Sequence, residues 1–151
     1  MKINHDDMIK DMQAAAKDLA EEGYTCVLRK GGDRVFSYEH GIRPLLGWLE
    51  EGRDFSGYGA ADRVVGRAAA LLYARLGVQA LYGQIISEQA LPILDQQGVT
   101  YAYDTKVPFI INQRNDGMCQ MEQAVWDVSD PVEAELRLKN KVRKMTQEDA
   151  G

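Results

Sequence analysis

No other feature of this sequence restricts the possible folds as much as the nearly continuous apolar run at 78–86, VQALYGQII. Such a run is typical of a strand that is buried on both faces, as at the centre of a parallel sheet. It follows the segment 62–76, in which apolar residues recur at helical spacing. A buried strand beside an apolar-striped helix predicts an α/β fold.

Helical and strand-like patterns alternate along the rest of the chain. The predicted helices lie at 5–22, 42–51, 62–76, 87–97, from 118 to about 128, and from Pro131 to about 145. The predicted strands lie at 24–30, 34–39, 78–86 and 99–103, and 107–111 is either a further strand or an extended segment. Asn4 and Gly23 suit the two ends of the first helix, and 31–33, GGD, suits a hairpin turn.

The composition is that of an ordinary globular protein, and residues 1–151 are expected to form a single domain. The net charge of −5 argues against a nucleic-acid partner, and the basic residues from Arg137 to Lys144 fit the end of a helix. No apolar run is long enough to cross a bilayer, and the N-terminus is too polar for a signal peptide. A cytoplasmic location without a membrane partner is therefore expected.

Three motifs and the order of the predicted elements resemble an uncharacterised prokaryotic domain family with a cytidine-deaminase-like fold. The motifs are ADRVVGRAAALL at 61–72, ISE at 86–88 and DGMCQME at 116–122. The resemblance extends from about the hairpin to the final helix. It implies a three-layer α-β-α sandwich around a mixed sheet, and proteins of this fold often self-associate, so a homodimer is expected.

Active deaminases of this fold bind zinc through a His/Cys-Ala-Glu motif at one helix start and a Pro-Cys-x-x-Cys motif at the next. The resemblance places the first motif near 60–62, AAD, with alanine at the ligand position and Asp62 near the proton-shuttling Glu. The second falls near 87–90, SEQA, which has no cysteine. No zinc site, no cofactor and no zinc-dependent deamination are therefore expected. A new zinc site from Cys26, His40 and Cys119 is the less favoured alternative.

Asp62 and Glu88 are expected at the N-termini of two neighbouring helices, above the ends of the strands. Two carboxylates there could act as an acid/base pair or bind Mg²⁺. The alternative is structural, because Asp is a favoured helix cap and Glu in a first turn is favoured by the helix dipole. Ser87 is likewise a helix cap or a ligand contact.

The glycine-rich turn 57–59, GYG, precedes the predicted helix at 62–76 and could cradle a phosphate. Arg63 and Arg67 are one helical turn apart in this prediction and could add positive charge. Arg43 could bind a carboxylate or phosphate from the start of the helix at 42–51. The alternative for the turn and for Arg63 and Arg67 is a flexible loop beside a solvated helix face, and for Arg43 it is an exposed surface role.

The loop and helix start at 112–122, NQRNDGMCQME, combine amides, carboxylates and a thiol around a turn. Asn112, Asp116 and Glu122 are candidate ligand contacts. Cys119 near a helix N-terminus would have a lowered thiol pKa, which favours a nucleophile. The alternative for Cys119 is a buried structural cysteine.

The sequence favours a zinc-free protein with a deaminase-like fold that binds a small polar metabolite, such as a nucleotide or a nucleobase-like compound. The second hypothesis is an enzyme of another chemistry, with catalytic candidates Asp62, Glu88 and Cys119. A third is a homo-oligomeric interaction protein. The candidate ligand-binding residues are Arg43, Asp62, Arg63, Arg67, Ser87, Glu88, Asn112, Asp116, Cys119 and Glu122.

Overall fold

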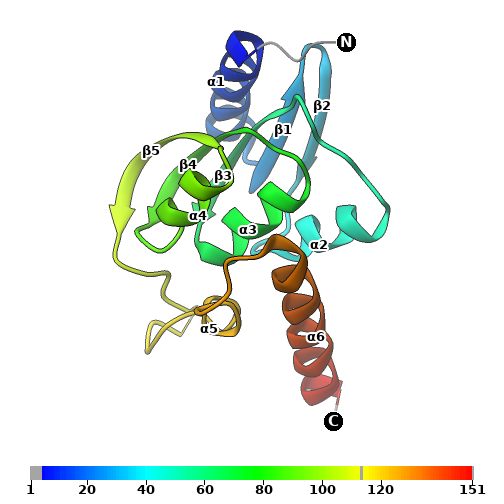
Figure 1. Cartoon of the computed structure of the whole chain (residues 1–151), viewed down its shortest axis with the longest axis vertical. Coiled ribbons are helices and arrows are strands. Elements are labelled where there is room, and N and C mark those ends of the chain that lie inside the picture. Colours follow the sequence, from blue (N-terminus) through cyan, green and yellow to red (C-terminus); the bar gives the residue numbers. More distant parts are fainter. Residues whose placement is uncertain (1–4, 113, 151) are drawn as a thin grey trace.

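The computed structural model describes residues 5–112 and 114–150 and contains a five-stranded sheet with helices packed on it (Figure 1). The strands are β1 (Cys26–Lys30), β2 (Asp33–Ser37), β3 (Gly59–Val65), β4 (Ala80–Ser87) and β5 (Thr100–Val107). The helices are α1 (His5–Glu22), α2 (Arg43–Glu50), α3 (Arg67–Arg75), α4 (Leu91–Gln96), α5 (Gln120–Ala124) and α6 (Pro131–Ala150).

The sheet is mixed, with the strand order β2-β1-β3-β4-β5. β1 pairs antiparallel with β2 and with β3, whereas β3, β4 and β5 run parallel. Gly31 turns the hairpin between β1 and β2 with a φ of 58°, as predicted for this position. The α/β class and the mixed sheet are therefore confirmed.

Helix α1 packs on β1, β3 and β4 through a stripe of residues that recur at helical spacing. The stripe is buried and consists of Met8, Met12, Ala15 and Leu19. The helix approaches the sheet most closely at Gly59, where a Cβ would lie 2.2 Å from the backbone nitrogen of Met12. Only glycine fits at this crossing.

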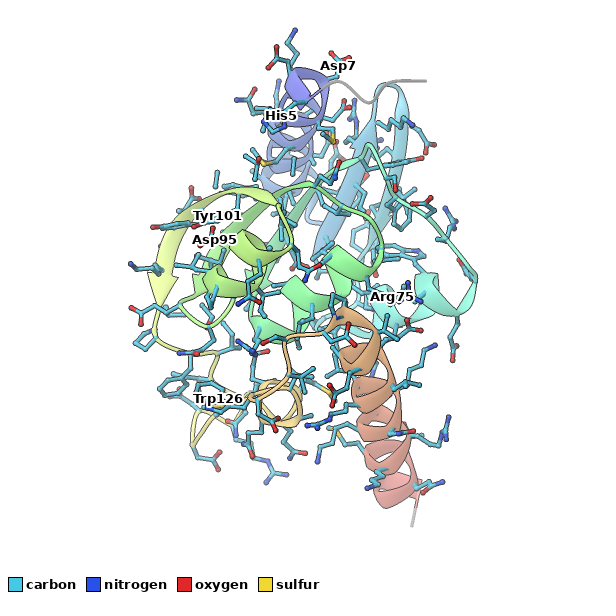
Figure 2. The ribbon with its side chains drawn as sticks, in the orientation of Figure 1. His5, Asp7, Arg75, Asp95, Tyr101 and Trp126 are labelled. Carbon is cyan, nitrogen blue, oxygen red and sulfur yellow. The ribbon has the colours of Figure 1, made fainter. Side chains whose placement is uncertain are left out.

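The largest hydrophobic cluster joins the sheet to helices α2, α3, α4 and α6. Helix α3 is its centre, because Leu71, Leu72 and Tyr73 have no exposed surface. Helix α6 packs on α3 through Ala134 and Leu138. Arg75 also joins these helices, since its Nε donates to Glu135 Oε1 at 2.9 Å, and it is labelled in Figure 2.

The predicted helix at 62–76 is wrong in its first part, because residues 59–65 form β3 and helix α3 begins at Arg67. Gly66 separates the two elements in an extended conformation, with a φ of −95° and a ψ of −172°. The valines at 64 and 65 fit a helical stripe as well as a strand, so periodicity alone does not separate the two. The tripeptide 57–59 therefore leads into a strand and not into a helix.

The other boundaries differ by shorter lengths. Ser87 ends β4 and α4 begins only at Leu91, so the predicted helix at 87–97 is too long. Pro92 then falls in the first turn of α4, where its missing N–H needs no partner. β5 continues to Val107, α5 ends early at Ala124, and Asn4 lies outside the described residues.

Within the described part of the chain, no helix combines the length and apolarity that a membrane-spanning segment requires.

Candidate functional site

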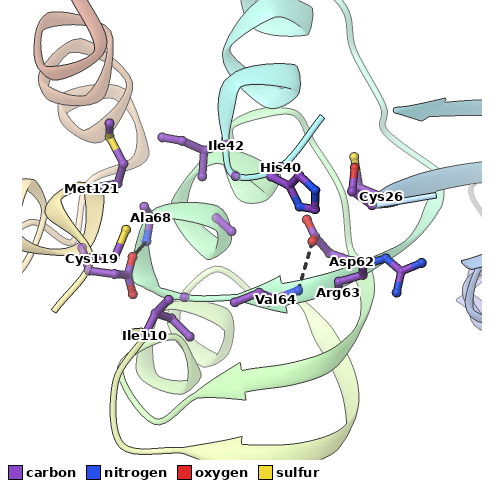
Figure 3. Close-up of a pocket in the computed structure, with 15 residues that line it drawn as sticks. Cys26, His40, Ile42, Asp62, Arg63, Val64, Ala68, Ile110, Cys119 and Met121 are labelled. Atoms are coloured by element: carbon purple, nitrogen blue, oxygen red, sulfur yellow. Dashed lines mark hydrogen bonds between the residues drawn. The ribbon is translucent and has the colours of Figure 1, made fainter. Parts of the chain in front are cut away.

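A pocket with a volume of about 130 Å³ lies at the carboxyl end of β3, next to the start of α3 (Figure 3). The connection from β2 to α2 contributes His40 and Ile42 to its wall. The segment from β5 to α5 contributes Ile110 and Cys119. Parts of the chain that are far apart in sequence thus meet around one end of the sheet, where clefts of α/β proteins commonly form.

Asp62 provides a carboxyl group in this pocket. Its Oδ2 accepts a hydrogen bond from the Tyr73 hydroxyl at 2.6 Å, and its Oδ1 accepts one from the Val64 backbone N–H at 3.2 Å. Burial raises the pKa of this carboxyl to about 7, against the opposing effect of these hydrogen bonds. Near neutral pH, Asp62 can therefore exchange a proton or act as an acceptor for a ligand.

Cys26 lies beside Asp62 because β1 and β3 pair these two residues. The side chain of Tyr73 is fully buried on the same face of the sheet. Burial, and then the nearby Asp62 carboxylate, raise the pKa of the Cys26 thiol well above its usual range. Cys26 therefore stays a protonated thiol and serves as a small buried residue of the core.

Glu122 also lines the pocket, and its carboxylate caps helix α3. Its two oxygens accept the backbone N–H groups of Arg67 at 2.6 Å and Ala68 at 2.7 Å. These bonds satisfy two of the free donors that begin every helix. Burial raises the pKa of Glu122, while the two N–H bonds and the charge of Arg67 oppose that rise. Glu122 thus fastens α5 to α3.

Arg67 has a structural role, because its guanidinium is buried and donates to backbone carbonyl groups. Its Nη2 bonds Val128 O at 2.6 Å and its Nε bonds Val125 O at 2.9 Å. Arg63 is on β3, and its Nε donates to Tyr24 O at 2.7 Å. The two arginines are therefore not neighbours on one helix face, and the predicted phosphate cradle does not form.

Asp62 and Glu88 are not paired at two helix N-termini as predicted. Asp62 lies inside β3, and Glu88 is exposed after the end of β4. Glu88 is also outside the set of residues that line the pocket. Ser87 accepts the Gln89 N–H at 2.9 Å through its hydroxyl oxygen, which closes a local turn.

Arg43 lies apart from this pocket, in a shallow hollow between α2 and α6. Asn112 and Asp116 bond mainly to each other, since Asn112 Nδ2 donates to Asp116 Oδ1 at 2.8 Å. They close the exposed loop and do not line the pocket. Of the predicted site residues, the structure brings Asp62, Arg63, Cys119 and Glu122 together.

The three residues of the alternative zinc site, Cys26, His40 and Cys119, all line the pocket. Across residues 5–112 and 114–150, however, no three His, Cys, Asp or Glu side chains are grouped closely enough to bind a metal ion. In Figure 3, Cys26 and Cys119 lie at opposite ends of the pocket.

Several pocket residues were not predicted as ligand contacts, among them His40, Ile42 and Met121. His40 is one of only two histidines in the sequence, and this rarity could have marked it as a candidate site residue. The partner of Asp62, Tyr73, gave no signal, because it falls in a helix whose apolar pattern already explains it. Ile42 and Met121 likewise resemble ordinary core residues.

Comparisons with known proteins identify the family but no activity. The sequence profile of a domain of unknown function, DUF1893 (TM1506), matches residues 14–142. The chain belongs to the DUF1893 family. The crystal structure of a DUF1893 family protein, TM1506 from Thermotoga maritima, is similar with a TM-score of 0.79 and 23% sequence identity. The match covers 87% of this chain and 90% of that one, and at this identity it shows a shared fold alone. No curated protein matches.

Proposed function

We propose that this DUF1893 domain binds a small polar molecule, such as a nucleotide or a nucleobase-like compound, in the pocket beside Asp62. The observation that carries the proposal is the partly buried Asp62 carboxyl in a pocket whose other walls are mostly apolar. Ligand sites commonly combine apolar walls with a few polar groups that fix orientation. A nucleobase has this character, with apolar faces and a polar edge.

We also propose that the fold is a three-layer α-β-α sandwich of the cytidine-deaminase type. The packing of α1 on β1, β3 and β4, with α3 and α4 in a separate core cluster, supports this arrangement. The deaminase resemblance would put zinc ligands at the starts of two helices. Here α3 and α4 follow Gly66 and Ala90, which have no ligating side chain. The proposed function therefore involves binding without that zinc motif.

Two exposed residues on neighbouring strands, Val64 and Ile85, allow a matched test of the pocket. Val64 lines it and is 41% exposed, and its cross-strand partner Ile85 is 39% exposed but lies outside it. Val64→Trp should fill the pocket and remove the binding of free nucleobases and nucleosides. Ile85→Trp adds the same side chain to the neighbouring strand and should preserve binding.

Binding is measured by native mass spectrometry of the purified protein and by NMR titration with the nucleobases and nucleosides. Thermal unfolding of both variants checks that they fold. The proposal fails if no compound binds to the wild-type protein at millimolar concentrations, or if Val64→Trp binds as well as Ile85→Trp.

The position of Cys119 in the same pocket favours a second candidate, an enzyme that uses this thiol as a nucleophile. Cys119 is partly exposed and is the N-cap residue of α5. A nucleophile should react with iodoacetamide at neutral pH faster than a cysteine in an unfolded peptide. Peptide mapping by mass spectrometry measures this rate, with the buried Cys26 as the internal control. A rate equal to the peptide's would contradict the enzyme hypothesis.

A cytoplasmic location, a homodimer and the absence of nucleic-acid and membrane partners stay predictions.

A further inference from the structure

Asp62 is held in one orientation by hydrogen bonds to both of its oxygens. The Tyr73 hydroxyl occupies one acceptor site of Oδ2, and the Val64 N–H occupies one acceptor site of Oδ1. Each carboxylate oxygen can accept two hydrogen bonds. These two bonds therefore leave acceptor capacity on a carboxylate whose plane is already fixed.

Asp62 also forms no salt bridge in the described part of the chain, although the nearby charge of Arg63 acts to lower its pKa. The adjacent Arg63 directs its Nε to the Tyr24 carbonyl at 2.7 Å, and Figure 3 shows the Arg63 guanidinium turned away from the pocket. A buried carboxylate without a salt bridge is unfavourable, and a ligand that brings a cation would relieve this.

The other acidic group of the pocket is less accessible to a ligand than Asp62. Glu122 is 3% exposed, and its two oxygens accept the N–H groups of Arg67 and Ala68 at the start of α3. The remaining walls are largely apolar and include Ile42, Ala68, Ile110 and Met121. The imidazole of His40 faces Asp62 in Figure 3, and both side chains line the pocket.

We propose that the pocket selects a small base with two parallel N–H donors, of the amidine or 2-aminopyridine type, and that both oxygens of Asp62 bind this pair. The inference rests on the proposed function and names the chemical class of its ligand. Two parallel N–H···O bonds to a carboxylate are short and strong, because both partners carry charge. The apolar body of the base would then lie against Ile42, Ala68 and Met121.

Benzamidine is the probe, and two analogues separate the contributions. Benzamide has nearly the same shape but is neutral and offers one donor group. Benzylamine has the same charge on a single nitrogen. Isothermal titration at about pH 8 should give a dissociation constant for benzamidine at least about tenfold below that of either analogue.

Two conservative variants test whether Asp62 is the binding group. Asp62→Asn should raise the dissociation constant of benzamidine to that of benzamide, because the amide replaces one acceptor oxygen with a donor. Glu88→Gln removes an exposed carboxylate outside the pocket and should leave the constant unchanged within about twofold. Circular dichroism verifies that both variants are folded.

The outcomes also separate this inference from the proposed function. If nucleobases bind in a manner that Val64→Trp abolishes, while benzamidine binds no tighter than benzamide, the donor-pair inference is overturned and the proposed function stands. Equal binding of benzylamine and benzamidine overturns it as well, since charge alone would explain affinity. If neither benzamidine nor any nucleobase binds, both proposals fail.

Discussion

Asp62 and Glu122 are two carboxyl groups in one pocket with different roles. Glu122 is 3% exposed and gives both oxygens to backbone N–H groups at the start of α3. Asp62 also accepts one donor on each oxygen, the Tyr73 hydroxyl and the Val64 N–H, but it is only partly buried. Burial raises the pKa of both groups. The greater exposure of Asp62 makes it the functional candidate and Glu122 a structural one.

The contact between Glu122 and Gly66 predicts a large effect for one added methyl group. A Cβ at position 66 would lie 2.2 Å from Glu122 Oε1, so Gly66→Ala must push the carboxylate off the helix. Losing these charged hydrogen bonds should lower the free energy of unfolding by about 2 kcal/mol. Urea denaturation followed by circular dichroism measures the change. Gly47→Ala, in an open part of α2, is the control and should not destabilise.

A double-mutant cycle separates the lost cap from other effects of the methyl group. Glu122→Ala removes both the cap and the atoms that the new methyl group would strike. In that background, Gly66→Ala should add less than about 0.5 kcal/mol to the destabilisation. Simple additivity of the two changes would contradict the proposed contact.

At the scale of elements, the sequence predicted the helices and strands whose local pattern has only one interpretation. The apolar stripe of α1 and the glycine-containing hairpin are both present. The run at 78–86 predicted β4, which is the fourth strand of five in the sheet. Each of these patterns lies within one continuous segment of the sequence, so tertiary contacts were not needed to identify it.

The strand β3 could not be separated from α3 by periodicity. Its first residues are small, and Val64 and Val65 fit both patterns. What fixes 59–65 as a strand is pairing with β1 and β4, which is a long-range property. This error moved Asp62 from a strand to a helix cap and so gave it a wrong local environment.

For the whole molecule, the pocket is assembled from parts of the chain that no local pattern connects. His40 comes from the β2–α2 connection, Asp62 from β3, and Cys119 from the segment before α5. The sequence suggested the region at 112–122, yet only its second half reaches the pocket. Asn112 and Asp116 close their own loop instead. Which residues meet depends on the strand order, and that order is a property of the complete fold.

The same pocket predicts how the stability of the whole molecule depends on pH. In the folded protein the pKa of Asp62 is raised from 3.8 to about 7, so the folded state retains a proton that the unfolded chain loses. The free energy of unfolding should therefore decrease as the pH rises from about 4 to about 7, and then level off. Asp62→Asn cannot ionise and should lack this part of the decrease, which is on the order of 4 kcal/mol.

Other groups also titrate in this interval, so the informative quantity is the difference between wild type and Asp62→Asn at each pH. Tyr73, Cys26, His40 and Arg63 surround the carboxyl in both proteins. Urea denaturation at several pH values measures both free energies.

The wild type should lose stability relative to the variant as the pH rises, since only its carboxyl must be ionised inside the pocket. A difference that is independent of pH would mean that Asp62 ionises as freely in the folded protein as in the unfolded chain. Burial would then not hold its proton, and the pocket would have to be more hydrated than its apolar walls indicate.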